Sequence, residues 1–246
     1  MKDAVVESKR IIDEARARGV VLRLAGGLAV RQHCREFEFC ERDYGDIDFV
    51  GLSQQSPAII ETIPGLGYHE NTQFRLTSGG TRLLFEKPGS SDHVDVFLDR
   101  LRMEHDIDLR DRLDIEENTI SVSDILVTKL IITKMNEKDY RDIITIVKDL
   151  ALGEEDAPKT INVRYIGALC AENWGLYHDV ITTLDACADF MRQYHLGEET
   201  AQDVLKKLML IRTAIVTYPK SMRWRLRSHI GTRLAWRREV ELQNKE

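Results

Sequence analysis

The chain has 246 residues, of which 43% are hydrophobic and 31% are charged, and its net charge is −6. This composition is typical of a folded protein and argues against an intrinsically disordered chain. No apolar run approaches the ~20 residues that a membrane-spanning helix needs, and the charged N-terminus, MKDAVVESKR, is unlike a signal peptide. We therefore predict a cytoplasmic protein that does not associate with a membrane.

The cysteines give no sign of a disulfide framework. Cys34, Cys40, Cys170 and Cys187 are few for 246 residues, and no CxxC pair indicates zinc. His33 beside Cys34, with Cys40 close by, leaves a metal site open as an alternative, although no fourth ligand lies nearby in the sequence. We interpret these cysteines as buried or reduced thiols.

Hydrophobic periodicity and turn residues predict the elements in chain order. They are a helix over 3–18, a strand at VVLRLAGG, helical GLAVRQHC, irregular REFEFCERDYG, a strand at DIDFVGL, a helix over 56–63, a hairpin of 72–77 with 81–86, a strand over 93–98, a helix opened by a capping box at Ser121 and Asp124, a helix from about Asn136, a linker over 153–160, and three or four further helices. This order predicts the α+β (α/β) class, a mixed β-sheet flanked by helices, with one domain over 1–152 and an all-helical domain over 161–246.

Three features of the first hundred residues point to the same chemistry. Gly26 and Gly27 lie where a strand passes into a helix, a position at which backbone amides can approach a phosphate. Asp46 and Asp48 are two apart in a predicted strand, so their carboxylates share a face, where they repel each other unless a divalent cation lies between them. Asp95 interrupts another apolar strand, HVDVFL, where an acid needs a cation or a strong donor. A solvated strand face is the alternative.

These motifs resemble the DNA polymerase β-type nucleotidyltransferase superfamily. The resemblance covers roughly residues 20–150 and rests on LAGGLAVRQHC, DYGDIDFVG and HVDVF. It implies the nucleotidyltransferase fold for the first domain. The segment DILVTKLIITKMNEKDYRDI is similar to the Lys-helix and (Lys/Arg)-Asp-x-x-Asp elements of the AbiEii-type toxin branch. The gap between the glycines and the first aspartate is longer than the family pattern, and we expect the insertion REFEFCERDYG to form a loop at the mouth of the site.

The resemblance implies a catalytic and metal-binding role for the three aspartates. Asp46 and Asp48 would bind two Mg²⁺ ions (Mn²⁺ is an alternative), and Asp95 would complete the catalytic metal site. Asp95 would also accept the proton of the attacking hydroxyl.

The same resemblance implies nucleotide contacts for Gly26, Gly27, Lys129 and Lys138. The glycines would hold the triphosphate. Lys129 lies in an apolar helical pattern, where contact with phosphate and snorkelling to solvent are both open. The pair Asp139 and Asp142 shares a helix face and either positions these lysines or is merely exposed.

The implied function is transfer of a nucleoside monophosphate from an NTP to a hydroxyl acceptor with release of pyrophosphate. The acceptor is open between RNA, such as a tRNA end, and a small molecule, as in aminoglycoside or lincosamide nucleotidyltransferases. A nucleotide-binding module without turnover is a further alternative. The toxin-like branch also implies an antitoxin partner, and the sequence leaves the oligomeric state open.

Ten basic residues and no acidic ones lie between Val204 and Arg238. Such a stretch is typical of a nucleic-acid-binding surface, but it could equally form ion pairs with acidic parts of the chain. Trp224 and Trp236 within the stretch could stack on bases, although core packing is the simpler interpretation.

Overall fold

The structure is a computed structural model that describes residues 4–40, 42, 44–191 and 196–239. The chain forms two compact units. The first contains residues 1–101 and 107–125, and the second contains residues 102–106 and 126–246. This division falls earlier in the chain than the linker at 153–160, and the predicted domain limits of 1–152 and 161–246 remain a prediction.

The first unit has a mixed sheet and short helices. Its elements are α1 (Ala4–Ala17), β1 (Leu22–Leu24), α2 (Gly26–His33), α3 (Phe37–Cys40), β2 (Asp46–Gly51), α4 (Ser56–Thr62), β3 (His69–Glu70), α5 (Thr72–Thr77), β4 (Arg82–Glu86) and β5 (His93–Leu98). The hairpin of β6 (Arg100–Arg102) and β7 (Asp106–Asp108) follows, and its residues 102–106 belong to the second unit.

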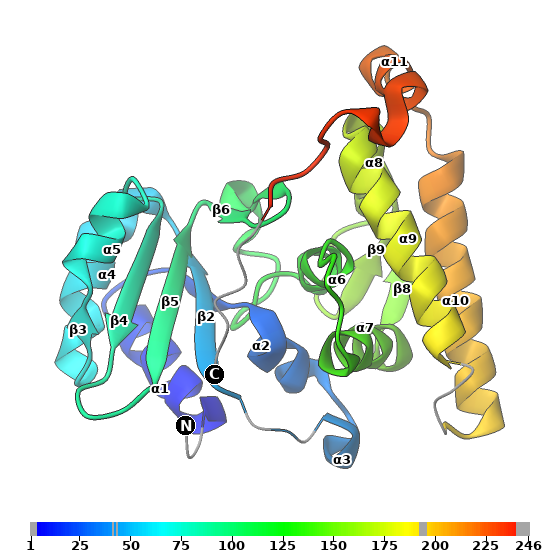
Figure 1. Ribbon diagram of the computed structural model, residues 1–246. Coiled ribbons are helices and arrows are strands. Elements are labelled where there is room, and N and C mark those ends of the chain that lie inside the picture. The colour runs from blue at the N-terminus through cyan, green and yellow to red at the C-terminus, as the bar shows by residue number, and fades with distance from the viewer. Residues whose placement is uncertain (1–3, 41, 43, 192–195, 240–246) are drawn as a thin grey trace. The chain divides into compact units, whose positions relative to one another are not determined.

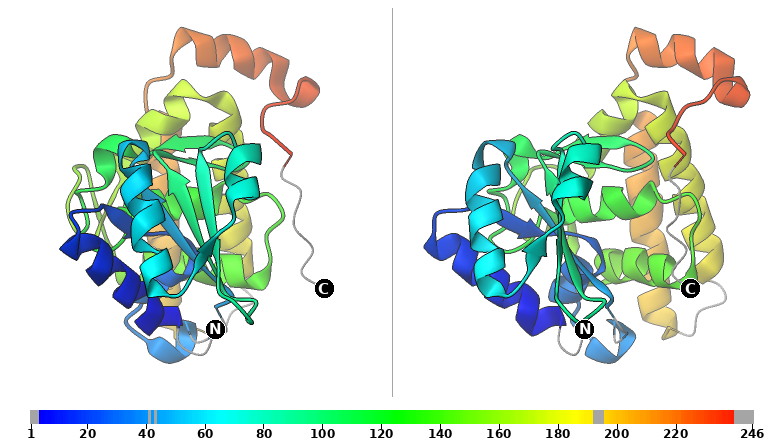
Figure 2. Two further views of the ribbon diagram at one scale, coloured as in Figure 1. Left: turned by 90° about the vertical axis from the view of Figure 1, so that its left-hand side faces the viewer. Right: turned by 60° about the vertical axis from the view of Figure 1, so that its left-hand side comes forward.

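The five strands of the sheet are ordered β1-β2-β5-β4-β3, and β2, β5 and β4 are seen side by side in Figure 1. Strands β2 and β5 run parallel, while β1 pairs with β2 and β4 pairs with β5 in the antiparallel sense. Side chains such as Ile47, Phe49, Val94 and Val96 are completely buried, because alternate residues of the central strands face the core. Helices α1 and α4 lie next to each other beside the sheet (Figure 2).

Two predictions for the first unit are wrong. The stretch REFEFCERDYG, predicted to be irregular, contains the short helix α3. The sequence predicts residues 72–77 as a strand of a hairpin, but they form the helix α5. Asn71 caps this helix by accepting a hydrogen bond of 2.9 Å from the Phe74 amide, and such a cap fixes the first turn. The hairpin partner of β4 is β5 instead.

The second unit is mainly helical. It contains the C-terminal part of α6 (Val122–Leu130) together with α7 (Glu137–Asp149), β8 (Ala151–Gly153), β9 (Thr160–Asn162), α8 (Val163–Glu172), α9 (Trp174–Met191), α10 (Glu198–Thr217) and α11 (Met222–Ile230). Both predicted helix starts are confirmed. The Asp124 amide donates to the Ser121 hydroxyl over 3.1 Å, and Asn136 forms a full capping box with Asp139.

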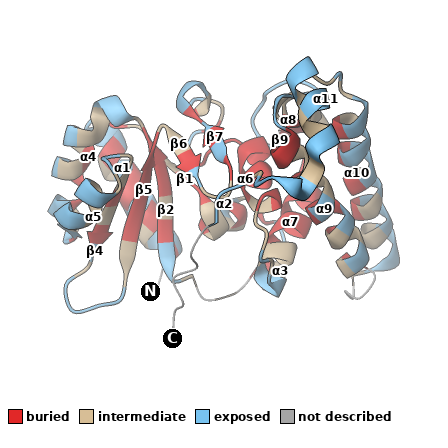
Figure 3. Cartoon of the chain, turned by 45° about the horizontal axis from the view of Figure 1, so that its top comes forward, coloured by how far each residue is buried: buried red, intermediate tan, exposed pale blue. Residues whose placement is uncertain are grey.

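Apolar residues of α7, α8, α9 and α10 form the core of the second unit, and Figure 3 colours the buried residues red. The predicted architecture, a mixed sheet with helices followed by a helical C-terminal part, is confirmed by these two units. Within the described residues, no helix is long and apolar enough to cross a membrane.

Candidate active site

The three predicted aspartates lie on the two central parallel strands of the first unit. Asp48 of β2 and Asp95 of β5 are direct partners in the register, and Asp46 lies opposite His93. Directly paired residues of neighbouring strands point to the same face of the sheet, and residues two apart along one strand also share a face. The sheet therefore brings all three carboxylates to one face, as the alternation predicts.

The burial of the three acids is graded along this face. Asp46 is exposed, Asp48 is half-buried, and Asp95 is 3% exposed. Carboxylate oxygens are the ligands that Mg²⁺ and Mn²⁺ prefer, so the donor set on this face fits a divalent cation. In the described part of the chain, however, no three acidic, His or Cys side chains are already gathered around one point as metal ligands. The face supplies the ligands, and a bound ion would have to draw them together.

Gly26 gives Asp48 its place beside the start of α2. Gly26 has a φ of +63°, and a Cβ at this position would be 2.3 Å from Oδ2 of Asp48. The Ala25 amide donates to the Asp48 carbonyl over 2.8 Å, which joins the strand to the helix start. The glycine is therefore required by the close approach of the Asp48 carboxylate, a role that the sequence interpretation did not foresee. The first amides of a helix have no partner within that helix and favour anions, so a role with phosphate stays a prediction for Gly26 and Gly27.

The insertion between Gly27 and Asp46 brings a cation to this helix start. A Cβ at Gly27 would be 2.3 Å from the Arg42 guanidinium, and Arg42 also lies over the ring of Tyr44, 5.0 Å from its centroid. The Tyr44 hydroxyl in turn donates to the Cys40 carbonyl over 2.9 Å. The insertion thus places the Arg42 guanidinium beside the first backbone amides of α2. The sequence interpretation did not foresee Arg42.

The cysteine interpretation is wrong for half of the cysteines. Cys34 and Cys40 form a disulfide across the insertion, whereas Cys170 and Cys187 are free and buried. The short helix α3 ends at Cys40, and the Cα atoms of the two cysteines are 6.6 Å apart. His33 lies 3.0 Å from the Thr119 hydroxyl, and no metal cluster containing it occurs among the residues described.

A second missed cation, Arg82 of β4, binds the buried aspartate. Its Nε donates to Oδ1 of Asp95 over 2.7 Å, and a second guanidinium nitrogen binds Oδ2. The guanidinium also lies over the rings of Phe97 and Phe74, 4.5 and 5.4 Å from their centroids. Burial acts to lower the pKa of Arg82, but the hydrogen bond to Asp95 and the charges of Asp95 and Asp48 outweigh it and raise this pKa. Arg82 therefore compensates the negative charge of the site.

The two predicted lysines belong to the second unit. Nζ of Lys129 lies 2.8 Å from Asp142 and 3.7 Å from Asp139, and the lysine side chain is 11% exposed. This pairing matches the interpretation in which the two aspartates position Lys129. Lys138 is exposed in the first turn of α7. The role of both lysines in nucleotide binding remains a prediction.

Most cations of the basic stretch bind partners within the second unit. Six of its cations have partners there: Lys207 with Asp203, Arg212 with Asp185, Lys220 with the Ile215 and Tyr218 carbonyls, Arg227 with the Gly231 and Leu234 carbonyls, Arg237 with Asp179, and Arg238 with Asp106. The other four, which we call the exposed cation group, lie on α10, on α11 and just after it: Lys206, Arg223, Arg225 and Arg233. Ion pairs with acidic residues thus account for four of the ten cations, all within the second unit, and backbone carbonyls account for two more.

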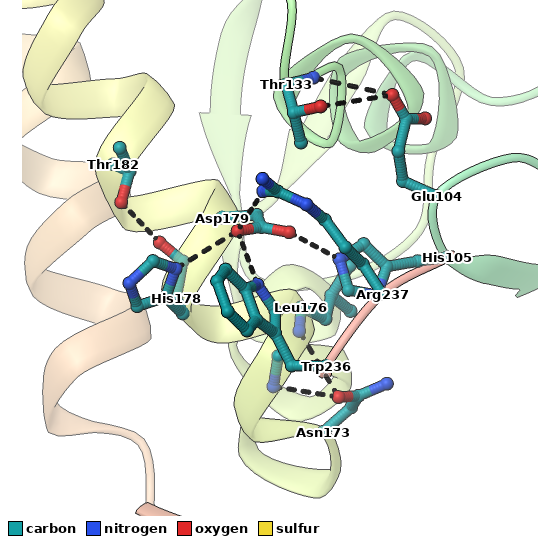
Figure 4. Close-up of polar contacts among 11 residues, drawn as sticks. Glu104, His105, Thr133, Asn173, Leu176, His178, Asp179, Thr182, Trp236 and Arg237 are labelled. Atoms are coloured by element: carbon teal, nitrogen blue, oxygen red, sulfur yellow. Dashed lines mark hydrogen bonds and ion pairs between the residues drawn. The ribbon is translucent and has the colours of Figure 1, made fainter. Parts of the chain in front are cut away.

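Asp179 of α9 is the centre of a polar cluster that the sequence did not predict (Figure 4). It is 3% exposed and lies within hydrogen-bonding distance of His105 Nε2 at 2.8 Å, His178 Nδ1 at 3.0 Å, Trp236 Nε1 at 2.9 Å and Arg237 at 3.0 Å. Burial acts to raise the pKa of Asp179, but the contacts with His105, Trp236 and His178 and the charge of Arg237 lower it to about 2. Through Trp236 and Arg237, the cluster binds the segment after α11 to α9.

Trp236 completes this attachment. Its ring packs edge-on against Trp174 and His178, with centroid distances of 6.3 and 5.2 Å. Trp224 packs in the same way against Tyr177 at 5.1 Å. Packing within the unit is thus the structural role of both tryptophans, as the simpler interpretation of the sequence has it.

Two solved structures resemble the chain at a distance. No protein-family model matches the chain, and no curated protein matches it. The solution structure of the antibiotic-resistance factor ANT(2'')-Ia is similar with a TM-score of 0.41 and 12% identity, over 95% of this chain and 98% of that chain. The crystal structure of an antigenic nucleotidyltransferase-like protein from Paracoccidioides brasiliensis has a TM-score of 0.43 and 13% identity, over 91% of this chain and 96% of that chain. Likenesses this distant establish neither a shared fold nor a shared activity.

Proposed function

We propose that the first unit transfers a nucleoside monophosphate from an NTP to a hydroxyl acceptor and releases pyrophosphate. The observation that carries the proposal is the register of Asp48 with Asp95 on adjacent parallel strands, beside a helix that starts at Gly26. Acidic side chains facing each other are destabilising unless a cation compensates them. A helix start next to them favours an anion. A metal-bound triphosphate would meet both preferences, because the metal ion is positive and the phosphates are negative.

Each residue of this face has a role in the proposed reaction. Asp46, Asp48 and Asp95 would hold two Mg²⁺ or Mn²⁺ ions, which when bound polarise the phosphoryl oxygens and lower the pKa of the acceptor hydroxyl. The amides at Gly26 and Gly27 and the guanidinium of Arg42 would bind the phosphates.

The reaction makes one bond and breaks one. The acceptor oxygen forms a bond to the α-phosphorus of the NTP. The bond from this phosphorus to the oxygen that bridges the α- and β-phosphorus atoms breaks, and pyrophosphate leaves with that oxygen. Asp95 would take the hydroxyl proton. Both of its oxygens accept a hydrogen bond from Arg82, and these bonds favour the ionised form that can accept a proton.

The acceptor is the open part of the proposal. An RNA acceptor, which a toxin-like enzyme implies, is supported by the exposed cation group, because phosphates bind arginine and lysine side chains without regard to base sequence. A small-molecule acceptor is the second outcome that an assay has to distinguish. The antitoxin partner and the cytoplasmic location stay predictions.

One assay tests both the activity and the acceptor. The chain is incubated with each α-³²P-labelled NTP and Mg²⁺ or Mn²⁺, in the presence of total tRNA or of a panel of aminoglycosides and lincosamides. Transfer of label to RNA or to a drug identifies the acceptor class. A nucleotide that binds but is never transferred would favour the module without turnover, and absence of both binding and transfer would contradict the proposal.

Variants of Asp46 and Asp48 separate a catalytic role from a structural one. We expect Asp46→Asn or Asp48→Asn to abolish transfer while the unfolding midpoint without metal holds or rises, because each change removes one charge from a repulsive group. Asp95→Ala should lower turnover by several orders of magnitude and change NTP affinity far less, because the interaction is made mainly in the transition state. A marked fall in the midpoint for the first two variants would make these acids structural.

A further inference from the structure

We infer that Arg82 acts as a built-in counter-ion of Asp95, which a metal ion has to displace before it can bind the three carboxylates. This inference rests on the proposed function and adds a positioning residue to it. Arg82 would keep the nucleotide-free site closed to metal.

The contacts of Asp95 carry the first step. Both of its oxygens accept hydrogen bonds from the Arg82 guanidinium, and its side chain is only 4% exposed. A carboxylate buried to this extent needs a compensating charge, and Arg82 supplies one. A metal ion that binds Asp95 needs an oxygen that now faces the guanidinium, so the two cations compete for the same carboxylate.

The surroundings of the guanidinium carry the second step. It lies over the rings of both Phe74 and Phe97, whose faces favour a cation, and its side chain is 39% exposed. After Asp95 changes partner, Arg82 can remain at the site because these rings still hold it. A guanidinium freed in this way binds phosphate through two parallel hydrogen bonds. Release from Asp95 is therefore compensated when the metal arrives together with a triphosphate.

The first test measures the affinity for Mn²⁺ alone, from the free Mn²⁺ signal in electron paramagnetic resonance. We expect Arg82→Met to bind Mn²⁺ about tenfold more tightly than the unmodified chain, because the competing charged hydrogen bonds are gone. Asp95→Asn should remove this difference, so Arg82→Met has no effect in that background.

Arg75→Met is a matched control. Arg75 lies in the same unit, its side chain is 35% exposed, and it pairs with Glu70 over 2.5 Å. The control removes one positive charge of similar exposure from an ion pair that contains none of the three aspartates. Equal Mn²⁺ affinities for the Arg82 and Arg75 variants would overturn the inference.

A second measurement needs no substitution at position 82 in the protein that is tested. The Nε–H signal of Arg82 in ¹⁵N-resolved NMR spectra, assigned by its loss in Arg82→Lys, should exchange slowly with water before Mg²⁺ is added. We expect saturating Mg²⁺ to accelerate this exchange at least severalfold, because the bond to Asp95 is lost. Unchanged exchange at a Mg²⁺ concentration that saturates the site would show that both cations bind together and would overturn the inference.

The outcomes also separate this inference from the proposed function. If Mn²⁺ binds and Asp48→Asn abolishes the binding, the metal site stands, and only the comparison of Arg82→Met with Arg75→Met decides the role of Arg82. If Mn²⁺ binding to the unmodified chain and to Arg82→Met does not depend on Asp48, the metal site and the role of Arg82 fail together.

Discussion

The substitution Gly26→Ala separates the stability of the fold from the integrity of the site. A methyl group at this position would be 2.3 Å from Oδ2 of Asp48, whereas ordinary contact begins at 3.4 Å. The carboxylate must therefore move by about 1 Å, and a side-chain end can move this far more easily than the backbone can. We expect the fold to survive this movement and the site to lose function.

The two effects have different magnitudes. The φ of +63° at Gly26 should cost about 1–2 kcal/mol of unfolding free energy with any residue that has a Cβ. A displacement of about 1 Å in a catalytic group can cost about 100-fold in rate. Mn²⁺ affinity should fall as well, since Asp48 would no longer lie beside Asp95 in the position that the register gives it.

Gly79→Ala is the matched control. Gly79 has a φ of +62°, and a Cβ there would meet nothing within 4 Å. Both variants should lose similar unfolding free energy in urea, because they impose the same backbone strain. Only Gly26→Ala should lose Mn²⁺ binding and label transfer. If Gly26→Ala kept both at the level of Gly79→Ala, the position of the Asp48 carboxylate would be unimportant and the proposed site would be wrong.

Three further predictions concern other parts of the chain. The pKa of Asp179 is about 2, below the ordinary value of 3.8, so its ionised form stabilises the fold above the ordinary pKa. About 2 kcal/mol of unfolding free energy should be lost as the pH falls from about 5 to about 2, and urea unfolding of Asp179→Asn should lack this loss; parallel pH profiles would contradict it. Thiol titration of the unfolded chain should find only Cys170 and Cys187 before reduction, and all four cysteines after it; four at the outset would exclude the disulfide. If RNA is the acceptor, RNA-binding affinity falls with salt, and the slope of log K against log salt should become less steep by about three units when the exposed cation group is neutralised. An unchanged slope would exclude phosphate contact by this group.

Local patterns in the sequence predicted the acidic half of the site. Asp46, Asp48 and Asp95 alternate with apolar residues that the core buries, and alternation alone assigns a residue to a face of a strand. The helix after Gly26 follows from a strand that ends in two glycines. These features need no knowledge of distant contacts, so the sequence could show them.

The basic half of the site depends on long-range pairing and was missed. Arg82 reaches Asp95 only because β4 pairs with β5 in a register that places Leu84 opposite Asp95, and the sequence does not contain that register. Arg42 lies in an insertion where no periodic pattern predicts a position. The wrong strand prediction at 72–77 has a local cause, since Thr72, Phe74 and Leu76 alternate as strand residues do. The chain forms a helix there nevertheless, and Asn71 caps it.

The ion pair between Arg82 and Asp95 links the stability of the first unit to the chemistry proposed for it. Without metal, a buried carboxylate beside Asp48 is tolerated because a guanidinium compensates it. In the inference drawn above, the same guanidinium is the group that a metal ion would displace. Substitutions that weaken the ion pair while keeping the carboxylate should therefore lower the stability of the metal-free chain and raise its affinity for metal. Stability and metal affinity would then change in opposite directions at position 82, whereas a purely structural ion pair would change stability alone.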